Sequence, residues 1–403
     1  QRQMCIRDRG LEIPVLLGGA AINPSFVGAA AEIQEVGPPS KIPEPATAGV
    51  SREAPGGEAP VETRLYPQGV FYCKDAFAGL STMDALMDRE NRSDFLKSWA
   101  RTTRERAAQR RDMAARVAES APVSLRPAPS RDNDIPEPPF WGPRVLEKIP
   151  LTDLFPLIHR NTLFRLHWGA KNAKGEEFGR LLRDEFEPRL ARFQEDALKD
   201  DWLRVSAAYG FFPAASAGDD LILFNPDDPR KEVGRFPFPR QASRERLCLS
   251  DFFHPMDHDL PRESDSRKPE PGRRDTGLPR DTAALQIVTV QSPRLVEAVE
   301  SIPDGDYSEA YFLHGFGVRL AEAAAEYVHG RIRGELGIRP DQGLRYSWGY
   351  GACPDPLQHE TVFRLLPAES RLNMSLTDAG SLVPELSTAA LVVHHPEARY
   401  FSV

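Results

Sequence analysis

Three separate stretches of the chain hold residues whose types suit a small zwitterionic ligand. They are Glu322, the run 345–350 (RYSWGY) and the terminal pair Tyr400 and Phe401. An arginine can hold a carboxylate through two parallel hydrogen bonds, and a carboxylate can hold an ammonium group or a ribose diol. Aromatic faces pack against a heterocycle or a sulfonium. Together these residues indicate a site for an amino acid that carries a heterocyclic or aromatic attachment.

The same residues also have ordinary structural explanations. A glutamate on a helix is usually a solvated charge, and an arginine just after a helix often forms a surface ion pair. Aromatic residues near a chain end often fill the edge of a core. Residue types alone therefore leave open both a ligand site and a purely structural role.

Other kinds of catalytic or metal site find little support in the sequence. It contains no P-loop, HExxH, GxGxxG or nucleophile elbow, which disfavours a Rossmann-type methyltransferase or dehydrogenase and a hydrolase. His394 and His395 precede Pro396, which is typical of a turn, and the cysteines lack zinc spacing. We therefore expect no metal ligands, and the family resemblance described below implies that no side chain acts as a general acid or base. The cysteines are Cys5, Cys73, Cys248 and Cys353.

Composition limits the partners and the location of the protein. The chain has 403 residues and a net charge of −8, which predicts about two or three domains and argues against nucleic acid as a partner. The mean hydropathy is −0.44, and no apolar run approaches the roughly 20 residues of a membrane span. Unpaired cysteines fit a reducing compartment. We expect a cytoplasmic protein that binds neither nucleic acid nor membrane.

The first part of the chain has the pattern of an α/β domain. Residues 1–10 are charged, lack a secretory leader and run directly into a strand-like segment, 11–21, so we interpret the chain as a fragment of a longer protein. A second short strand is expected at 69–73, followed by helices up to residue 121. Residues 36–64 are rich in Pro, Gly, Glu and Ala, which predicts a disordered insertion.

A proline-rich linker, 122–142, precedes a second domain, 143–403. This domain begins with helices over 151–200, and a long helix over 307–337 carries the glutamate named above. Residues 254–280 are polar and predict a flexible insertion. The order of elements predicts an α+β fold with a central antiparallel sheet and flanking helices. Strand-like runs are expected at 209–215, 220–225, 234–239, 283–290 and the C-terminus.

Six stretches follow one another along the chain in the order of a known family. They are LEIPVLLGGAA, VFYCKDAFAGL, YGFFPAASAGDDLILF, RLAEAAAEYVH, RYSWGYGACPD and HPEARYFSV. Together they resemble the C-terminal part of cobalamin-dependent methionine synthase. Residues 1–121 look like the end of its cobalamin-binding domain, which is Rossmann-like with a parallel sheet. Residues 143–403 look like its activation domain, which binds S-adenosylmethionine.

The resemblance implies roles for the residues of the opening paragraph. Arg345 matches the arginine that anchors the ligand carboxylate and positions the sulfonium methyl group. Tyr350, Tyr400 and Phe401 match residues on the adenosine side of the ligand. Glu322 matches a glutamate that offsets the positive charge of the ligand.

Other positions match the family less closely. Ser347 stands where the family has an alanine whose backbone contacts S-adenosylmethionine. His159, with Asn161 beside it, falls at a ligand-binding aspartate of the family. Tyr346 and Trp348 replace two prolines of the family loop, and Gly351 replaces the proline that follows the loop tyrosine. We therefore expect this loop to be softer than in the family.

The resemblance also implies a partial cobalamin site. Gly18, Gly19 and Ala20 match a strand end that faces the nucleotide tail of cobalamin, and Ala76 matches a second contact with the tail. The cobalt-ligating DxHxxG motif of the family is absent. So are the folate module and the homocysteine module with its zinc. We therefore expect no turnover of homocysteine by this chain alone.

The function implied by the resemblance is the reactivation of a cobalamin enzyme. In the family, cobalamin carries methyl groups from methyltetrahydrofolate to homocysteine, and occasional oxidation gives inactive cob(II)alamin. The activation domain then presents the methyl group of S-adenosylmethionine while a flavodoxin- or ferredoxin-like protein supplies one electron. The implied partners also include the remaining modules of methionine synthase, and the implied outcome supports methionine biosynthesis.

Two other functions remain open. A regulatory or interaction module that has lost ligand binding would fit the departures at His159 and in the loop. A complete corrinoid methyltransferase would need a cobalt-ligating motif, which the sequence lacks.

Overall fold

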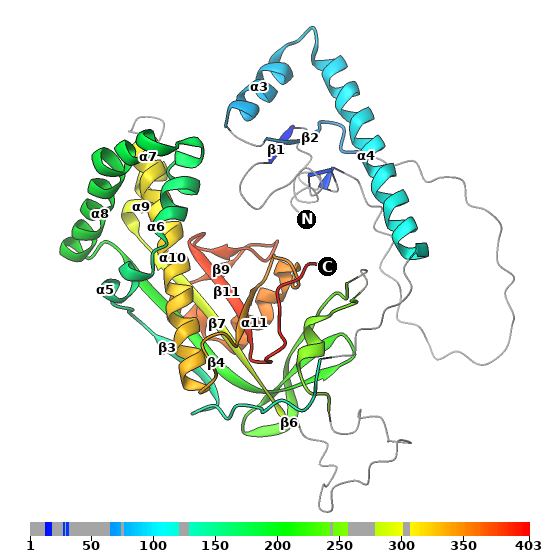
Figure 1. Ribbon diagram of the computed structural model, residues 1–403, viewed down its shortest axis with the longest axis vertical. Coiled ribbons are helices and arrows are strands. Elements are labelled where there is room, and N and C mark those ends of the chain that lie inside the picture. Colours follow the sequence, from blue (N-terminus) through cyan, green and yellow to red (C-terminus); the bar gives the residue numbers. More distant parts are fainter. Residues whose placement is uncertain are drawn as a thin grey trace, which may run out of the picture. The chain divides into compact units, whose positions relative to one another are not determined.

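The computed structural model divides the chain into two compact units, residues 1–121 and 122–403. Each is described by itself below (Figure 1). The predicted insertion 36–64 lies outside the described residues, and so does most of 254–280. The structure describes residues 13–17, 27–28, 30–31, 65–73, 76–120, 129–241, 245–256, 279–300 and 307–403.

The first unit contains a small parallel sheet, as the sequence predicts. Strand β1 (Val15–Leu17) pairs in parallel with β2 (Val70–Tyr72). Two helices follow, α3 (Ala76–Met87) and α4 (Arg92–Ser120). Trp99 of α4 packs on Phe71, with ring centroids 5.3 Å apart, and its indole N–H donates to the Val70 carbonyl at 3.1 Å. An aromatic cluster therefore fixes α4 against β2.

The second unit is built on a seven-stranded sheet whose strand pairings are all antiparallel. The order is β6-β5-β4-β7-β11-β8, and β3 pairs with β4. The predicted central antiparallel sheet is confirmed. A separate two-stranded sheet pairs β9 (Ser375–Leu376) with β10 (Leu382–Val383). The strands of the large sheet are β3 (Gly142–Leu146), β4 (Arg204–Ala217), β5 (Asp220–Asn225), β6 (Asp228–Pro237), β7 (Asp281–Gln291), β8 (Leu344–Ser347) and β11 (Ser387–Val393).

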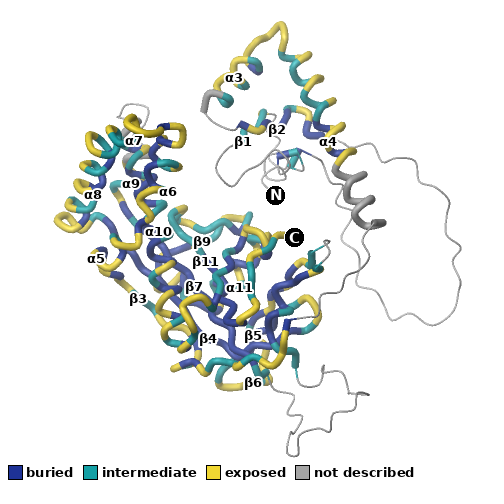
Figure 2. Tube along the Cα trace, in the orientation of Figure 1, coloured by how far each residue is buried: buried dark blue, intermediate teal, exposed yellow. Residues whose placement is uncertain are grey.

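Helices cover both faces of this sheet, so its central strands β4, β5, β7 and β11 are mainly buried (Figure 2). Along β4, Ala207, Tyr209 and Phe211 enter one core while Ala208 and Phe212 enter the other, as the two-residue period of a strand requires. One layer holds α5 (Leu151–Leu154), η1 (Phe155–Leu157), α6 (Arg160–Thr162), η2 (Leu163–His167), η3 (Ala170–Asn172), α7 (Gly175–Leu181), η4 (Leu182–Phe186), α8 (Glu187–Asp200), α9 (Pro293–Glu300) and α10 (Tyr307–Glu335). The other holds η5 (Leu249–Phe252), η7 (Pro356–Gln358), α11 (His359–Leu365) and α12 (Ala368–Leu372).

The long helix α10 is the element that positions the candidate site. It packs against β7, β4 and β11. Its buried face includes Leu313, Phe316, Leu320 and Ala324, which recur at the spacing expected of an amphipathic helix. Gln286 of β7 donates to the Ala325 carbonyl at 3.0 Å. The predicted long helix is confirmed, with its axis fixed on the sheet.

The described half of the predicted linker, residues 129–141, packs on the second unit. The Ser130 carbonyl accepts a hydrogen bond from His395 Nε2 at 2.8 Å, and the Pro136 carbonyl accepts from Thr282 at 3.1 Å. Prolines lack an N–H but keep their carbonyl acceptors, so a proline-rich segment can still be bonded by side chains. Hydrogen bonds thus hold this half of the predicted linker on the second unit.

A glycine pair tests the close approach of β3 to β4. A Cβ at Gly210 would lie 2.5 Å from the Gly142 carbonyl oxygen, whereas a Cβ at Gly330 of α10 meets nothing within 4 Å. Gly210→Ala is expected to lower the free energy of unfolding by more than about 1 kcal/mol. Gly330→Ala should raise it by about 0.5 kcal/mol. Urea denaturation of the full chain checks both, and equal stabilities would contradict the packing.

Candidate functional site

Strand β8 forms one end of the described sheet and carries the predicted arginine. It pairs only with β11, in a register that sets Arg345 opposite Val392 and Ser347 opposite Ala390. Successive side chains of a strand point to opposite faces. Arg345 accordingly reaches α10, while Tyr346 enters the core on the other face of the sheet.

Arg345 and Glu322 form an ion pair between β8 and α10. Arg345 Nη2 lies 3.1 Å from Glu322 Oε2, and the two side chains are 17% and 44% exposed. The second terminal nitrogen, Arg345 Nη1, is buried and has no hydrogen-bond partner among the described residues. Because a buried donor without an acceptor is costly, this half of the guanidinium group is suited to a carboxylate ligand.

Two further basic residues that the sequence interpretation missed surround the same glutamate. Arg319 lies one helical turn before Glu322, and burial lowers the pKa of its guanidinium while Glu322 opposes this shift and Arg345 adds to it. Burial also lowers the pKa of His167 on η2, and the charge of Arg319 adds to that effect. The available signal was the three-residue spacing of Arg319 and Glu322, which places both on one helix face.

The loop after β8 is held against the end of the chain. The Tyr346 hydroxyl donates to the Arg399 carbonyl at 2.7 Å, and burial raises the pKa of that hydroxyl. The Tyr346 ring lies 5.4 Å from Tyr400 and 6.4 Å from Phe401 between centroids. Gly351 adopts φ +43°, and a Cβ there would lie 2.8 Å from the Phe401 carbonyl oxygen. The structure thus brings together the loop and the terminal aromatic pair, as expected.

Tyr346 and Trp348 do not soften the loop, and that expectation is wrong. Both side chains are buried. The Trp348 indole donates to Gln358 Oε1 at 2.9 Å and packs 5.3 Å from the Phe236 ring. Cys353 Sγ donates to the Ser347 carbonyl at 3.1 Å. Aromatic side chains inserted in the core replace the rigidity that proline would supply.

Two predicted aromatic residues remain open to solvent. Tyr350 is 63% exposed and Tyr400 is 68% exposed. They are the immediate neighbours of Gly351 and Phe401, which are in contact with each other. Their rings contribute little to the core, so both remain free to pack on a planar ligand group.

His159 and Asn161 are exposed and engaged by their own helix end. His159 Nδ1 accepts from the Thr162 backbone N–H at 3.2 Å, which caps α6. Asn161 Oδ1 accepts from Arg165 Nε at 3.0 Å. Among the described residues, no hydrogen bond joins either side chain to Glu322 or Arg345. Their role in ligand binding stays a prediction.

Most of the residues predicted to contact cobalamin lie outside the part of the chain that the structure describes. Gly18, Gly19 and Ala20 lie outside the described residues, and Ala76 begins α3 with no side-chain surroundings described.

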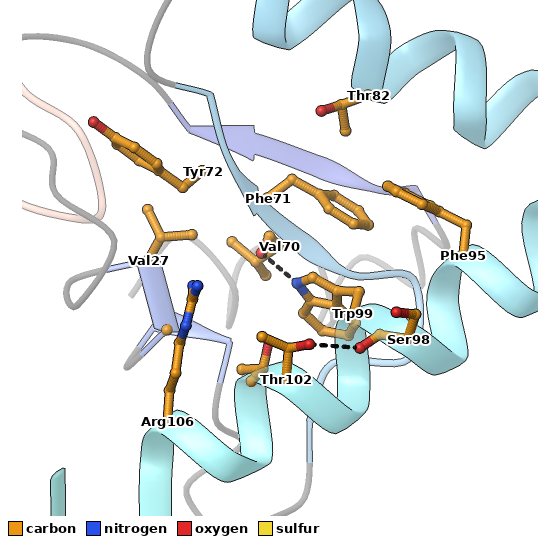
Figure 3. A pocket seen from close by; sticks show the side chains of 12 residues that line it. Val27, Val70, Phe71, Tyr72, Thr82, Phe95, Ser98, Trp99, Thr102 and Arg106 are labelled. Carbon is orange, nitrogen blue, oxygen red and sulfur yellow. Dashed lines mark hydrogen bonds between the residues drawn. The ribbon is translucent and has the colours of Figure 1, made fainter. Parts of the chain in front are cut away.

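The first unit also contains a cavity of about 430 Å³ between β2 and α4. Figure 3 shows Phe71, Trp99 and Arg106 around it.

The histidines and cysteines serve the fold where they are described. His394 Nε2 bonds buried Asp281 at 2.6 Å. Cys73, Cys248 and Cys353 are free and buried. Within the described ranges, no group of three His, Cys, Asp or Glu side chains is arranged for a metal ion. No helix there is long and apolar enough to cross a membrane.

The fold and the site define an α+β module with a charged pair between its long helix and the last strand of the described sheet. The family model of the vitamin B12 dependent methionine synthase activation domain matches residues 190–403, and the chain belongs to that family. Methionine synthases of Mycobacterium tuberculosis and Mycobacterium leprae are 32% and 30% identical to it over its whole length. The chain spans 33% of each of these relatives. The family resemblance read from the sequence is confirmed.

A solved structure agrees with the observed fold. The MetH reactivation domain bound to AdoHcy superposes with a TM-score of 0.54 and 21% identity. The match covers 67% of this chain and 83% of that one. The predicted fold class, an α+β activation domain preceded by a small parallel-sheet α/β piece, is thereby confirmed.

Tyrosines 346 and 350 offer a matched test of the loop anchor. Tyr346→Ala removes a buried ring and should lower the free energy of unfolding by about 3 kcal/mol. It should also speed amide exchange at residues 399–401, which contact Tyr346. Tyr350→Ala removes an exposed ring and should change stability by less than about 0.5 kcal/mol. Hydrogen-exchange mass spectrometry checks both, and equal exchange at the chain end would contradict the anchor.

Proposed function

We propose that the second unit binds S-adenosylmethionine at the Glu322–Arg345 pair and presents its methyl group for the reductive methylation of cobalamin. The proposal places the chain in the reactivation of methionine synthase, which supports methionine biosynthesis from homocysteine. Membership of the activation-domain family supports it, and so does the AdoHcy bound to the related solved domain. The observation that carries it is the buried, unpartnered Nη1 of Arg345 beside a glutamate.

The ion pair suits the amino-acid end of the ligand. Arg345 Nη1 donates to the ligand α-carboxylate, and Glu322 accepts from the ligand ammonium group. A zwitterion brings one charge of each sign, so it satisfies both side chains without leaving an unpaired charge. Ser347 offers its backbone beside Arg345. The exposed rings of Tyr350 and Tyr400 pack on the adenosine, with Phe401 next to them.

The chemistry asks the protein for position rather than for a proton. The methyl group leaves a sulfonium, and the sulfur departs as the neutral thioether of S-adenosylhomocysteine. Neither step transfers a proton, so no side chain acts as a general acid or base. The protein contributes by holding the donor in one orientation. Cobalamin, when bound, accepts the methyl group.

The remaining partners follow from the family. The electron comes from a flavodoxin- or ferredoxin-like protein, and the folate and homocysteine modules, with their zinc, belong to the longer enzyme. Gly18, Gly19, Ala20 and Ala76 are proposed contacts of the cobalamin nucleotide tail. His159 and Asn161 are proposed to lie at the edge of the S-adenosylmethionine site.

A second candidate is a regulatory or interaction module that has lost ligand binding. The observation that favours it is His159, which caps its own helix where the family has a ligand-binding aspartate. In that case the exposed tyrosines would contact a protein rather than a nucleoside.

Calorimetric titration of the full chain with S-adenosylmethionine separates the two candidates. Saturable binding is expected, and Arg345→Ala should weaken it by roughly tenfold or more, because hydrogen bonds to charged groups contribute about 1.5–3 kcal/mol. Arg339→Ala is the matched control, since Arg339 is exposed and Asp341 is its only ion-pair partner among the described residues. Absence of binding to the unaltered chain would favour the interaction module, and equal affinities of all three proteins would refute the assigned site.

A further inference from the structure

Arg319 is a half-buried arginine whose charge the fold leaves unsatisfied. Its Nε is buried without a hydrogen-bond partner. The residue forms no hydrogen bond or ion pair within the part of the chain that the structure describes. A buried polar group in this state costs free energy, and more so when it is charged. The position therefore calls for a partner that the described residues do not supply.

The charges around Arg319 indicate the sign of that partner. The nearest charged groups acting on it are Glu322, which favours its charged form, and Arg345, which opposes it. Glu322 is already bonded to Arg345 at 3.1 Å. Burial and the charge of Arg319 lower the pKa of His167, which favours its neutral form. The charge of His314 also lowers the pKa of His167. His314 Nε2 lies 4.0 Å from the exposed carboxylate of Glu385.

Arg319 Nε and Arg345 Nη1 are both buried and lack an acceptor among the described residues. A carboxylate has two acceptor oxygens, so one carboxylate can accept from both guanidinium groups. A phosphate dianion would place a second negative charge beside Glu322.

We propose that Arg319 is a second carboxylate-binding residue, which with Arg345 holds the α-carboxylate of the bound amino acid while Glu322 takes its ammonium group. This inference rests on the proposed function and names the part of the ligand that the site selects. Arg319 and Glu322 come from α10 and Arg345 from β8, and the ion pair between Glu322 and Arg345 joins the two elements at 3.1 Å. The site consequently requires a complete α-amino-acid head.

The consequence is a preference among adenosine thioethers and sulfoniums. S-adenosylmethionine and S-adenosylhomocysteine carry the full head. Decarboxylated S-adenosylmethionine keeps the ammonium group and lacks the carboxylate, and 5′-methylthioadenosine lacks both. Arg319 should contribute only to the binding of ligands that carry the carboxylate.

Calorimetry of the full chain with these four ligands tests the assignment. Arg319→Met keeps the aliphatic stem and removes the charge. It should weaken S-adenosylmethionine and S-adenosylhomocysteine on the order of tenfold and leave decarboxylated S-adenosylmethionine and 5′-methylthioadenosine within about twofold. Arg339→Met, at an exposed site, should change none of the four affinities. Arg319→Lys keeps the charge but loses the planar fork, so it should show an intermediate loss for the carboxylate-bearing pair.

The outcomes separate this inference from the function on which it rests. If the unaltered chain does not bind S-adenosylmethionine, the proposed function falls and this inference falls with it. If it binds and Arg319→Met weakens all four ligands equally, Arg319 is structural and only this inference is overturned. Unchanged affinities would overturn it as well. Should Arg319→Met fail to fold, as judged by its circular dichroism, the ligand ratios of Arg319→Lys decide by the same criteria.

Discussion

The ion pair between Glu322 and Arg345 is the contact on which the candidate site depends. It joins a helix to the last strand of the described sheet, at 3.1 Å and with the arginine mostly buried. Such a pair is stable only if both backbones are held in place, because desolvating two charges offsets most of their attraction. The apolar face of α10 on β7, β4 and β11 supplies that support. The core thus determines the geometry of the charged groups.

On the other face of β8, aromatic packing holds the loop that follows the strand in place. Tyr346 and Trp348 are neighbours of Arg345 and Ser347 in the sequence, yet they enter the opposite core. One face of the strand therefore carries the arginine of the proposed ligand site, and the other face anchors the loop. Because the anchor includes the Tyr346 hydrogen bond to the Arg399 carbonyl, the same side chain that fixes the loop also fixes the chain end beside it. Tyr350 and Tyr400 can remain exposed without becoming disordered for lack of support.

Much of the fold could be predicted because its signals are local. The apolar spacing along α10 and the strand patterns of β5 and β7 depend only on neighbouring residues. The six stretches that resemble the family could be recognised for the same reason, because each is a run of neighbouring residues. The role of Tyr346 was misread, since Gly and Pro nearby suggest a loop, whereas β8 exists only through its pairing with β11. The segment 151–200 was correctly expected to be helical, but its division into short turns depends on packing against α10.

Buried polar groups that lack a partner are harder to predict from the sequence than the fold is. Arg319 looks like any helix arginine in the sequence, and only the packing of η2 and β8 around α10 reveals its buried, unpartnered Nε. The proposed function gives this openness a reason. None of the three described cavities, of about 380–460 Å³, is lined by Glu322, Arg345 or Tyr400. A deep pocket would enclose a methyl group that has to reach an acceptor outside the domain. A charged clamp for the amino-acid head at the end of a sheet, with exposed rings beside it, holds the donor firmly at one end and leaves its sulfonium accessible.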